Sequence, residues 1–578
     1  MTPRMIGWVV GMAAAFAVIY YSLPKKLASP QNGDSRTAAS AVNRSQCESK
    51  LNKWIQSLDP VRHQFDTDLE GRVAELNRYW ETCGPKGDEP IVSDLKPLEA
   101  ALAGEAKDRA LAKKFSRRDV QHIRQSILMS RMAVRIAESR KTDRERALAA
   151  MTLISQQVDP IPQSSAVDRP LTPFESLLTG RGTASDRAWI FAEILRQIHI
   201  DVLVFQHSDP QVSPLVGVIG DQEILLFDPL TGFPVPAAGE ADRKAIFQEP
   251  ARLADAVADD GILRQLDVER SPFPWTAEQL KAATVGVIGT TCTWSPRMGE
   301  LQFQWPPGEP CIVFDSLGPT AGLERGLMVR AAEAVNSLGY ADRVRVWDYP
   351  EQRAAQYQSL GAEGSPHMQS LVEIMSGPTI VEANAGPANE LRTVTTYRSK
   401  HPLQQVRAQQ LIGDRVAAIQ GYLPLTRAHI APRNVEIQGD IQQILDQNRV
   451  VADWATYWLA STQYENKDMT SCLDTIRRYR REFALGEMTE SALMRQAACL
   501  VASQENQAAL ELLKAVSPGP NQWRRALLVR RLEQLIPGAA SPPSAPGSGA
   551  SPTSPEAPKS DPSAVPPAPP SATPVPEK

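Results

Sequence analysis

Hydrophobic residues recur every three or four positions through the first part of the chain, which is the spacing of amphipathic helices. Over residues 43–82 this spacing predicts a helical hairpin, with Asp59-Pro60 supplying the turn between its two helices. The same spacing over residues 93–112 and 117–155 predicts further helices. We therefore expect the region before the first strand to be mainly helical.

The pattern changes in the segment 170–236. A wide apolar face between Trp189 and Ile198 predicts a helix buried against a sheet. The continuous apolar run Val202–Phe205 predicts a strand covered on both faces. Two short strands are predicted at 216–219 and 224–227, joined as a hairpin by the polar turn between them.

Helix and strand patterns are mixed between residues 251 and 448. Strands are predicted at Leu301–Trp305 and Cys311–Asp315, and an extended segment at Val344–Trp347. A helix is predicted over Leu323–Leu338. The pattern leaves open whether this segment is a second α+β domain or an elaboration of the first.

The last apolar pattern, over about 449–536, is helical with a period near 34 residues, as in tetratricopeptide repeats. Small residues at Ala460, Cys472 and Ala509 allow paired helices to approach closely. Trp523–Leu535 would form a capping helix. Because so few repeats rarely stand alone, we expect the array to dock on the preceding domain.

The two ends of the chain differ from the body. The uncharged apolar run Ile6–Leu23 is nearly long enough to cross a bilayer as a helix. A cleaved signal peptide is the alternative, but Tyr20–Pro24 is a poor cleavage site, so we expect an uncleaved signal anchor. The Pro-, Ser- and Ala-rich tail from 538 to 578 is predicted to be disordered.

Six cysteines fall into three local pairs: Cys47 with Cys83, Cys292 with Cys311, and Cys472 with Cys499. Behind an export signal, an even number suggests disulfides, whereas six unpaired buried thiols are the alternative. No cysteine has zinc-ligand spacing, so we expect neither a metal nor a cofactor. The formal net charge is −4, and we see no dense basic stripe or basic helix, so we expect no nucleic-acid partner.

The segment Gly182–Phe205 reads as a loop, a helix and a strand, and it resembles the core of the transglutaminase-like, papain-related fold. In that family a cysteine opens the helix, a histidine lies on the next strand, and an aspartate follows, often before proline. The resemblance places Ala184 at the cysteine and Asp228 at the aspartate, whereas Ser213-Pro214 stands where the histidine is expected. It therefore implies the fold without the family's usual activity.

The order of segments along the chain points to a smaller group within the transglutaminase-like family. Blocks at 181–191 and 225–236, then Ser295-Pro-Arg-Met298, then a tetratricopeptide-like end, are similar to a group of exported transglutaminase-like proteins from planctomycete bacteria. The similarity covers most of residues 110–536, and the block 180–236 is its specific part. It implies an architecture rather than a reaction.

An alternative makes Ser185 a nucleophile, with His207 as its base and Asp228 orienting the imidazole. Against it, Ser185 and Asp186 would cap the helix, Asp228 would bind turn amides, and His207 would be a loop histidine.

The expected organisation is α+β and multidomain, with its parts in this order: signal anchor 1–28, linker 29–42, helical region 43–158, transglutaminase-like domain 159–250, mixed α/β segment 251–448, tetratricopeptide-like repeats 449–537 and disordered tail 538–578. We expect a non-catalytic, single-pass membrane protein, with its bulk exported to the periplasm, that binds a protein or peptide through its repeats. The alternatives are an amide hydrolase or acyl-transferase that uses Ser185, and a structural spacer of the cell envelope.

Overall fold

The computed structural model describes most of the chain between residues 37 and 536. The described ranges are 37–62, 69–85, 95–138, 140–162, 171–220, 223–239, 249–268, 271–307, 310–319, 325–359, 366–384, 393–433, 439–515, 519 and 521–536. The predicted signal anchor and Pro-rich tail lie outside these ranges. Among the described helices, none is both long enough and apolar enough to span a bilayer.

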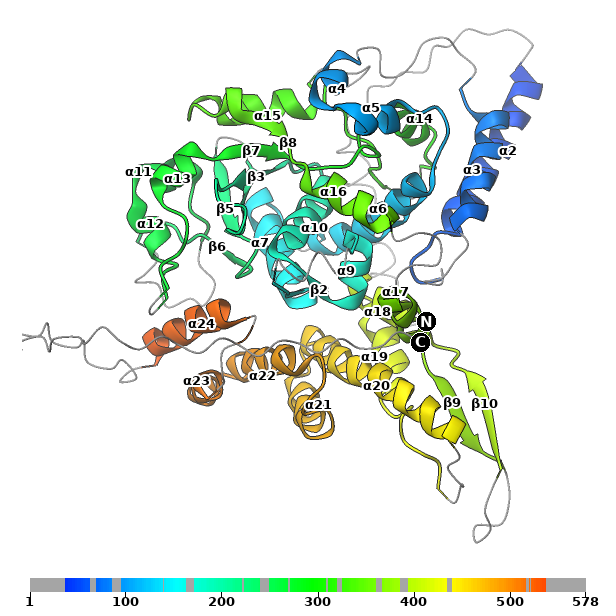
Figure 1. The fold of residues 1–578 in the computed structure, drawn as a ribbon, viewed down its shortest axis with the longest axis vertical. Helices are drawn as coiled ribbons and strands as arrows, with labels where there is room; N and C mark the ends of the chain where they lie inside the picture. Colours follow the sequence, from blue (N-terminus) through cyan, green and yellow to red (C-terminus); the bar gives the residue numbers. More distant parts are fainter. Residues whose placement is uncertain are drawn as a thin grey trace, which may run out of the picture.

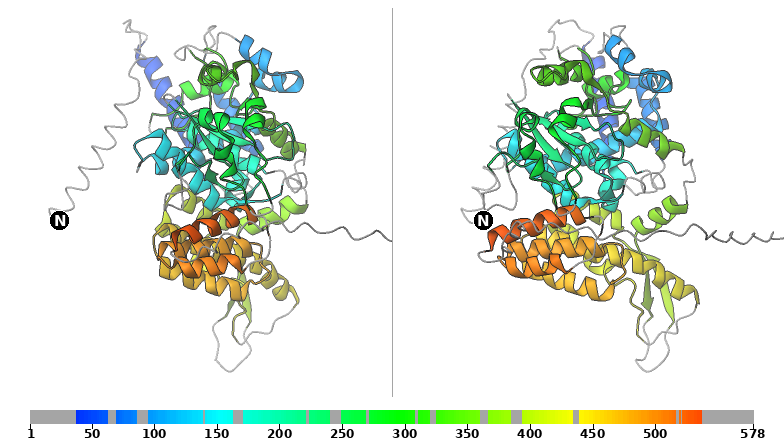
Figure 2. Two further views of the ribbon diagram at one scale, coloured as in Figure 1. Left: turned by 90° about the vertical axis from the view of Figure 1, so that its left-hand side faces the viewer. Right: turned by 60° about the vertical axis from the view of Figure 1, so that its left-hand side comes forward.

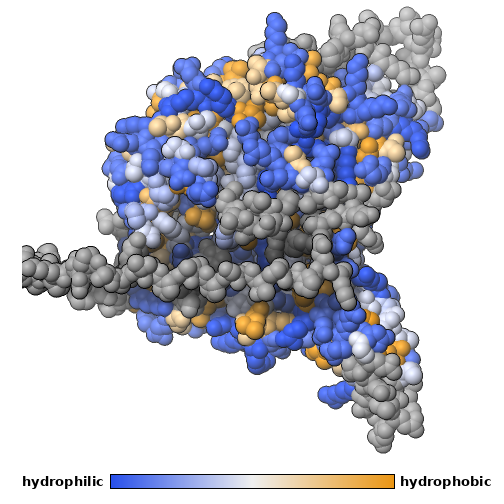
Figure 3. Space-filling model, in the orientation of Figure 1, coloured by the Kyte–Doolittle hydropathy of each residue, from blue (hydrophilic) through white to orange (hydrophobic). Residues whose placement is uncertain are grey.

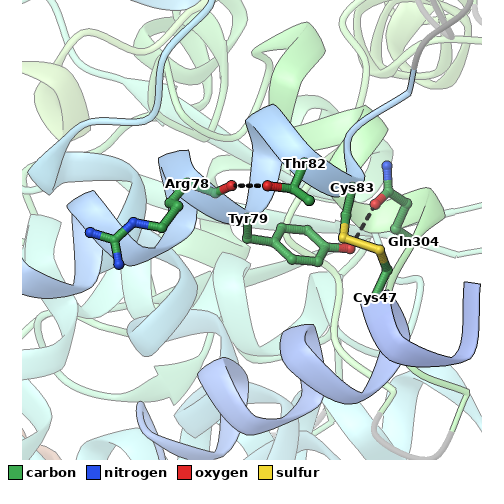
Figure 4. Close-up of a disulfide and its surroundings, with 6 residues drawn as sticks. All are labelled: Cys47, Arg78, Tyr79, Thr82, Cys83 and Gln304. Atoms are coloured by element: carbon green, nitrogen blue, oxygen red, sulfur yellow. Dashed lines mark hydrogen bonds between the residues drawn. A yellow bond between two sulfur atoms is a disulfide. The ribbon is translucent and has the colours of Figure 1, made fainter. Parts of the chain in front are cut away.

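The fold is α+β, and it begins with the predicted helical hairpin. Helices α2 (Thr37–Gln56) and α3 (Leu69–Cys83) pack against each other, and α2 starts inside the segment expected to be a linker. A disulfide joins Cys47 of α2 to Cys83 of α3 (Figure 4). The hydroxyl of Tyr79 donates to Gln304 Oε1 at 2.8 Å, which ties the hairpin to the body of the molecule.

The remaining N-terminal helices are α4 (Lys96–Ala101), α5 (Gly104–Leu111), α6 (Arg117–Ala137) and α7 (Asp143–Gln157). The predicted helix over 117–155 is thus two helices, because a capping box at Thr142 and Glu145 starts α7 afresh.

A six-stranded sheet forms the centre of the body (Figure 1). Its strand order is β6-β5-β4-β3-β7-β8, and only the β7–β8 pair is parallel. The strands are β3 (Val202–Gln206), β4 (Leu215–Ile219), β5 (Ile224–Asp228), β6 (Phe233–Pro234), β7 (Thr284–Val287) and β8 (Val344–Val346). The predicted strand and hairpin are confirmed, and residues 251–346 extend this same sheet with β7 and β8.

The two faces of the sheet contribute to two separate cores. Val202 and Val204 of β3 pack in a core with α6, α7 and α10 (Ala184–Arg196), the predicted buried helix. Leu203 and Phe205 point to the opposite face, because successive side chains of a strand alternate. That face is covered by α11 (Leu253–Ala258), α12 (Asp260–Arg264), α13 (Ala277–Ala282) and α15 (Leu327–Asn336).

Shorter elements complete the body. These are α9 (Pro173–Thr179), α14 (Pro296–Phe303), the 3₁₀ turn η2 (Ala341–Arg343), α16 (Tyr349–Ser359), and the parallel pair β1 (Asp159–Pro160) and β2 (Arg181–Gly182).

The predicted strands at 301–305 and 311–315 are wrong. Leu301–Phe303 ends helix α14, which begins at Pro296 with Ser295 as its N-cap residue. Leu301 is buried whereas Phe303 is 65% exposed, so the alternation of large apolar residues does not reflect one buried strand face. Residues 311–315 have no regular secondary structure and belong to none of the sheets of the described chain.

The C-terminal part is a helical array beneath the body (Figures 1 and 2). Its elements are α17 (Pro366–Met375), β9 (Thr379–Ala383), β10 (Val394–Arg398), α18 (Leu403–Ile412), α19 (Arg415–Leu425), α20 (Gly439–Glu465), α21 (Met469–Glu482), α22 (Thr489–Ala502), α23 (Asn506–Lys514) and α24 (Gln522–Leu535). From α18 to α24, consecutive helices pack against each other. Their assignment as tetratricopeptide repeats stays a prediction.

The array docks on the body, as expected, through one continuous hydrophobic core that includes α9, α10, α18 and α20. Arg407 of α18 crosses the joint and donates to the carbonyl oxygens of Gln157 and Leu177. Glu465 of α20 accepts hydrogen bonds from Arg135, Gln157 and Gln410. The two parts are therefore held together by both apolar and polar contacts.

On the face drawn in Figure 3, hydrophilic residues predominate over the described body, and hydrophobic residues are scattered in small groups. Some exposed apolar side chains belong to the array, where Ile430 is 58% exposed and Leu485 is fully exposed.

Candidate functional site

The N-terminus of α10 is the position that the sequence marked for a nucleophile. Thr183 is the N-cap residue, and its hydroxyl accepts a hydrogen bond from the Asp186 amide at 3.1 Å. The Asp186 carboxylate accepts in return from the Thr183 amide at 2.9 Å. This reciprocal pair is a capping box. Ala184 and Ser185 are the first two residues of the helix and are buried, so the cap is Thr183 with Asp186, and not Ser185.

Helix α16 covers this helix end. The Tyr349 hydroxyl donates to Asp186 Oδ1 at 2.9 Å, and Arg353 lies 3.4 Å from both carboxylate oxygens. Asp186 and Arg353 are almost fully buried. Burial and the charge of Asp186 raise the pKa of Tyr349 above its usual range, so this phenol remains protonated. The positive end of the helix dipole is thus already matched by a buried carboxylate.

Asp228 binds its own turn. Its carboxylate accepts from the amide of Leu230 at 3.0 Å and from the amide and hydroxyl of Thr231 at 3.3 and 2.8 Å. Burial raises the pKa of Asp228. Arg187 of α10 donates to the carbonyls of Pro229 and Leu230, which fixes the same turn to the helix. Asp228 therefore stabilises a turn and does not orient an imidazole.

His207 lies on the other side of the sheet from α10. It follows β3 and continues the alternation that places Leu203 and Phe205 on this face of the sheet. The centroids of its ring and of the Trp275 ring are 5.0 Å apart, and the two rings are nearly perpendicular. Its Nδ1 accepts from the Asp209 amide at 2.9 Å. The sheet therefore lies between His207 and the helix that carries Ser185, and the structure does not bring these two candidate residues together.

The cysteines form two of the three predicted pairs. Cys47–Cys83 and Cys472–Cys499 are disulfides, the second joining α21 to α22. Cys292 and Cys311 are buried and are not bonded to each other, which corrects the third pair. Burial raises the pKa of the Cys292 thiol well above its usual value, so it is a poor nucleophile. Cys311 packs in the apolar core shared by α3, α6 and α14.

A second candidate site is a cavity of about 170 Å³ between the body and the array. Helix α7, β1 and β6 line it from the body, and α20, α22, α23 and α24 line it from the array. Its polar lining includes Asp159, Arg495 and Arg524. The described residues contain no group of acidic, histidine or cysteine side chains that could hold a metal ion.

A third feature is a basic run on α21, at Arg477, Arg478, Arg480 and Arg481. The run is accompanied by two carboxylates: Asp474 lies 3.2 Å from Arg477, and Glu482 lies about 4 Å from Arg478 and Arg481. Arg480 instead donates to Gln496 at 2.8 Å. Positive charge is therefore in excess on this helix.

Sequence reasoning missed both of these features. The four arginines of the basic run can be read from the sequence, but the overall net charge of −4 gives no sign of a local excess of positive charge. Arg495 is an isolated charge within the apolar pattern of α22, which is the one local signal of the cavity. No sequence signal links Tyr349 and Arg353 to Asp186, because more than 160 residues separate them.

Comparisons with known proteins returned nothing: no family model matches the sequence, no curated protein matches it, and no solved structure matches the fold.

Proposed function

We propose that this chain is a non-catalytic, membrane-anchored protein of the cell envelope that binds a protein or peptide partner through its helical array. The non-catalytic part is supported by the start of α10: Ala184 stands where the resemblance expects the nucleophile, and Asp186, Tyr349 and Arg353 interact with one another at this helix end. A methyl group cannot attack a carbonyl. At the same helix end the amide of Thr183 donates to the Asp186 carboxylate, and the amide of Asp186 donates to the Thr183 hydroxyl.

The enzyme alternative lacks its other groups too. His207 lies across the sheet from Ser185, and Asp228 is occupied by its own turn. Acyl transfer needs the nucleophile, base and orienting group within hydrogen-bond reach of one another. The described residues do not assemble such a set at α10.

The partner proposed here is acidic. The basic run on α21 carries four arginines, two of which, Arg477 and Arg481, are largely exposed. Two exposed apolar residues, Leu485 and Ile430, lie near the end of this helix. They are close in sequence to Phe483 and His429, whose ring centroids are 5.4 Å apart. Basic side chains around exposed apolar ones favour an extended segment with alternating acidic and apolar residues.

The envelope location rests on two features. The apolar run 6–23 predicts an anchor, and two disulfides are typical of an oxidising compartment. Both favour placing the body outside the cytoplasm.

The test of the non-catalytic part uses the full-length chain in detergent with generic peptide substrates. We expect no amide hydrolysis or transamidation above that of Ser185→Ala and Asp228→Ala. Turnover that both substitutions abolish would overturn this part of the proposal.

The test of the binding part uses a fluorescent peptide that alternates Glu and Leu. We expect this peptide to bind, and we expect its affinity to fall steeply with salt and to be lost in Arg477→Glu/Arg481→Glu. The matched control is Arg325→Glu, at an exposed arginine on the body, which should leave the affinity unchanged. Equal binding of a Lys-Leu peptide would contradict the proposed charge of the partner.

A further inference from the structure

The cavity between the body and the array exists because of small side chains on α22. Ala497, Ala498 and Ala502 line it, and their methyl groups leave space that larger side chains would occupy. Its apolar lining is completed by Met494 and Val501 of α22 and by Leu528 and Leu532 of α24. A cavity of this kind at a joint between two parts is a typical place for a small ligand.

Two arginines give the cavity a polar end. Arg495 donates to the Gln156 carbonyl at 2.9 Å and lies over the Tyr464 ring at 4.8 Å. Arg524 donates to the carbonyl and hydroxyl of Ser155 at 2.7 and 3.3 Å, and lies over the Phe233 ring. In both arginines, Nε is buried and has no hydrogen-bond partner among the described residues.

The charge at this end is not balanced. The hydrogen bonds of Arg495 and Arg524 given above go to carbonyl and hydroxyl oxygens, and neither arginine forms a salt bridge with a described carboxylate, although Arg495 is only 4% exposed. Asp159 lines the same cavity, but its carboxylate accepts a hydrogen bond from Ser491 and is shared electrostatically between Arg187 and Arg524. Burial lowers the pKa of Arg524 to about 10, which still leaves it charged at neutral pH. Asp228 also offsets Arg187, so these three arginines face two carboxylates. Buried charges in proteins are normally paired, so one negative charge is lacking here.

The size of the cavity limits what could supply that charge. An engineered cavity of about 150 Å³ binds benzene, so 170 Å³ admits one ring or a branched chain of about six carbons. A planar guanidinium matches a carboxylate through paired hydrogen bonds. The single missing charge and the apolar remainder disfavour a phosphate dianion.

We propose that this cavity is a binding site for a small apolar monocarboxylate, with its carboxylate at Arg495 and Arg524 and its ring or aliphatic chain against Met494, Val501 and Leu528. The site is separate from α21 and does not depend on the proposed peptide partner. A ligand here contacts the body and the array together, so it stabilises their joint.

The test measures binding of benzoate and hexanoate to the full-length chain by calorimetry, with benzamide as a neutral analogue of benzoate. We expect benzoate to bind about tenfold more tightly than benzamide, which corresponds to one charge-assisted contact. Arg495→Gln and Arg524→Gln should each remove that preference, whereas Arg325→Gln should leave it intact.

A second variant keeps the test decisive if loss of a buried arginine prevents folding. Ala498→Leu retains both arginines and fills the cavity, so it should abolish the binding of benzoate and benzamide alike while the thermal midpoint is kept or rises. Benzamide binding as tightly as benzoate would overturn the ligand class. Unchanged binding in Ala498→Leu, or no binding by the unmodified chain, would overturn the site, and neither result bears on turnover or on the peptide.

Discussion

At the scale of single residues, Asp186 decides what the start of α10 can do. Its carboxylate completes a capping box with Thr183 and accepts from Tyr349 and Arg353 of α16. At a helix start without such a carboxylate, an anionic group would be stabilised by the same helix end. Here Asp186 occupies that helix end, and its contacts with Tyr349 and Arg353 join α10 to α16.

Asp186→Asn should therefore destabilise the chain strongly. The substitution keeps the size of the side chain but removes the buried negative charge that faces the guanidinium of Arg353, and breaking a buried ion pair costs about 3–5 kcal/mol. Denaturant unfolding of the full-length chain measures this loss. Ser185→Ala, at the adjacent buried position, is the control and should cost about 1 kcal/mol or less. Equal losses in the two variants would contradict the structural role of the ion pair.

At the scale of elements, hydrophobic periodicity predicted the secondary structure correctly where one pattern continued without interruption. It predicted α10, β3 and the β4–β5 hairpin, because their apolar residues face cores that span several turns or a whole strand. It failed at α14, where Leu301, Phe303 and Trp305 alternate as in a strand. The Ser295-Pro296 helix start outweighs that alternation. Partners distant in sequence, such as Arg353, left no local pattern to detect.

Helix α6 carries a pH-dependent contribution to stability. His122 is buried beside Val313, whose carbonyl lies 2.8 Å from its Nε2. Burial lowers the pKa of His122 from 6.5, against the opposing effects of Glu193 and Asp119. Below pH 6.5 the unfolded chain binds a proton that the folded chain does not, so stability falls as the pH falls through this window.

The expected slope is at most about 1.4 kcal/mol per pH unit, and unfolding midpoints between pH 7.5 and 5.5 measure it. His122→Gln should flatten this dependence, whereas His401→Gln, at an exposed position, should not. A slope that is identical in the original chain and in His122→Gln would refute this assignment.

The disulfides make a prediction for peptide mapping without reductant. Protein exported to an oxidising compartment should yield peptides that link Cys47 to Cys83 and Cys472 to Cys499. Cys292 should react with an alkylating agent only after unfolding, because its thiol is buried. A peptide that links Cys292 to Cys311 would show that the local pairing expected from the sequence holds after all.

At the scale of the whole molecule, the body and the array form one structure because they share a core. The joint is tight at Gly180, which ends α9 with a φ of +71°. A Cβ at this position would lie 2.2 Å from the ring of Trp458 in α20. Only glycine satisfies both the backbone conformation and the close approach of the two parts.

Gly180→Ala should accordingly weaken the joint. Gly339→Ala is the matched control, since Gly339 has a similar φ of +75° but open space around its Cβ position. We expect about 1–2 kcal/mol of backbone strain in each, and a further loss for Gly180→Ala from the contact with Trp458. Thermal unfolding of both variants measures the difference. Equal destabilisation would mean that the array does not press against α9 in solution.

The central claim is that more than a nucleophile is missing at α10, and Ala184→Cys tests it most directly. The variant places a thiol at the helix start but adds no base, and Tyr349 and Arg353 of α16 still bind Asp186 there. With thioester and peptide substrates and the full-length chain, we expect neither acyl-enzyme formation nor turnover above that of the unmodified chain. Turnover in Ala184→Cys that Asp228→Ala abolishes would contradict it and show that the rest of a working site is in place.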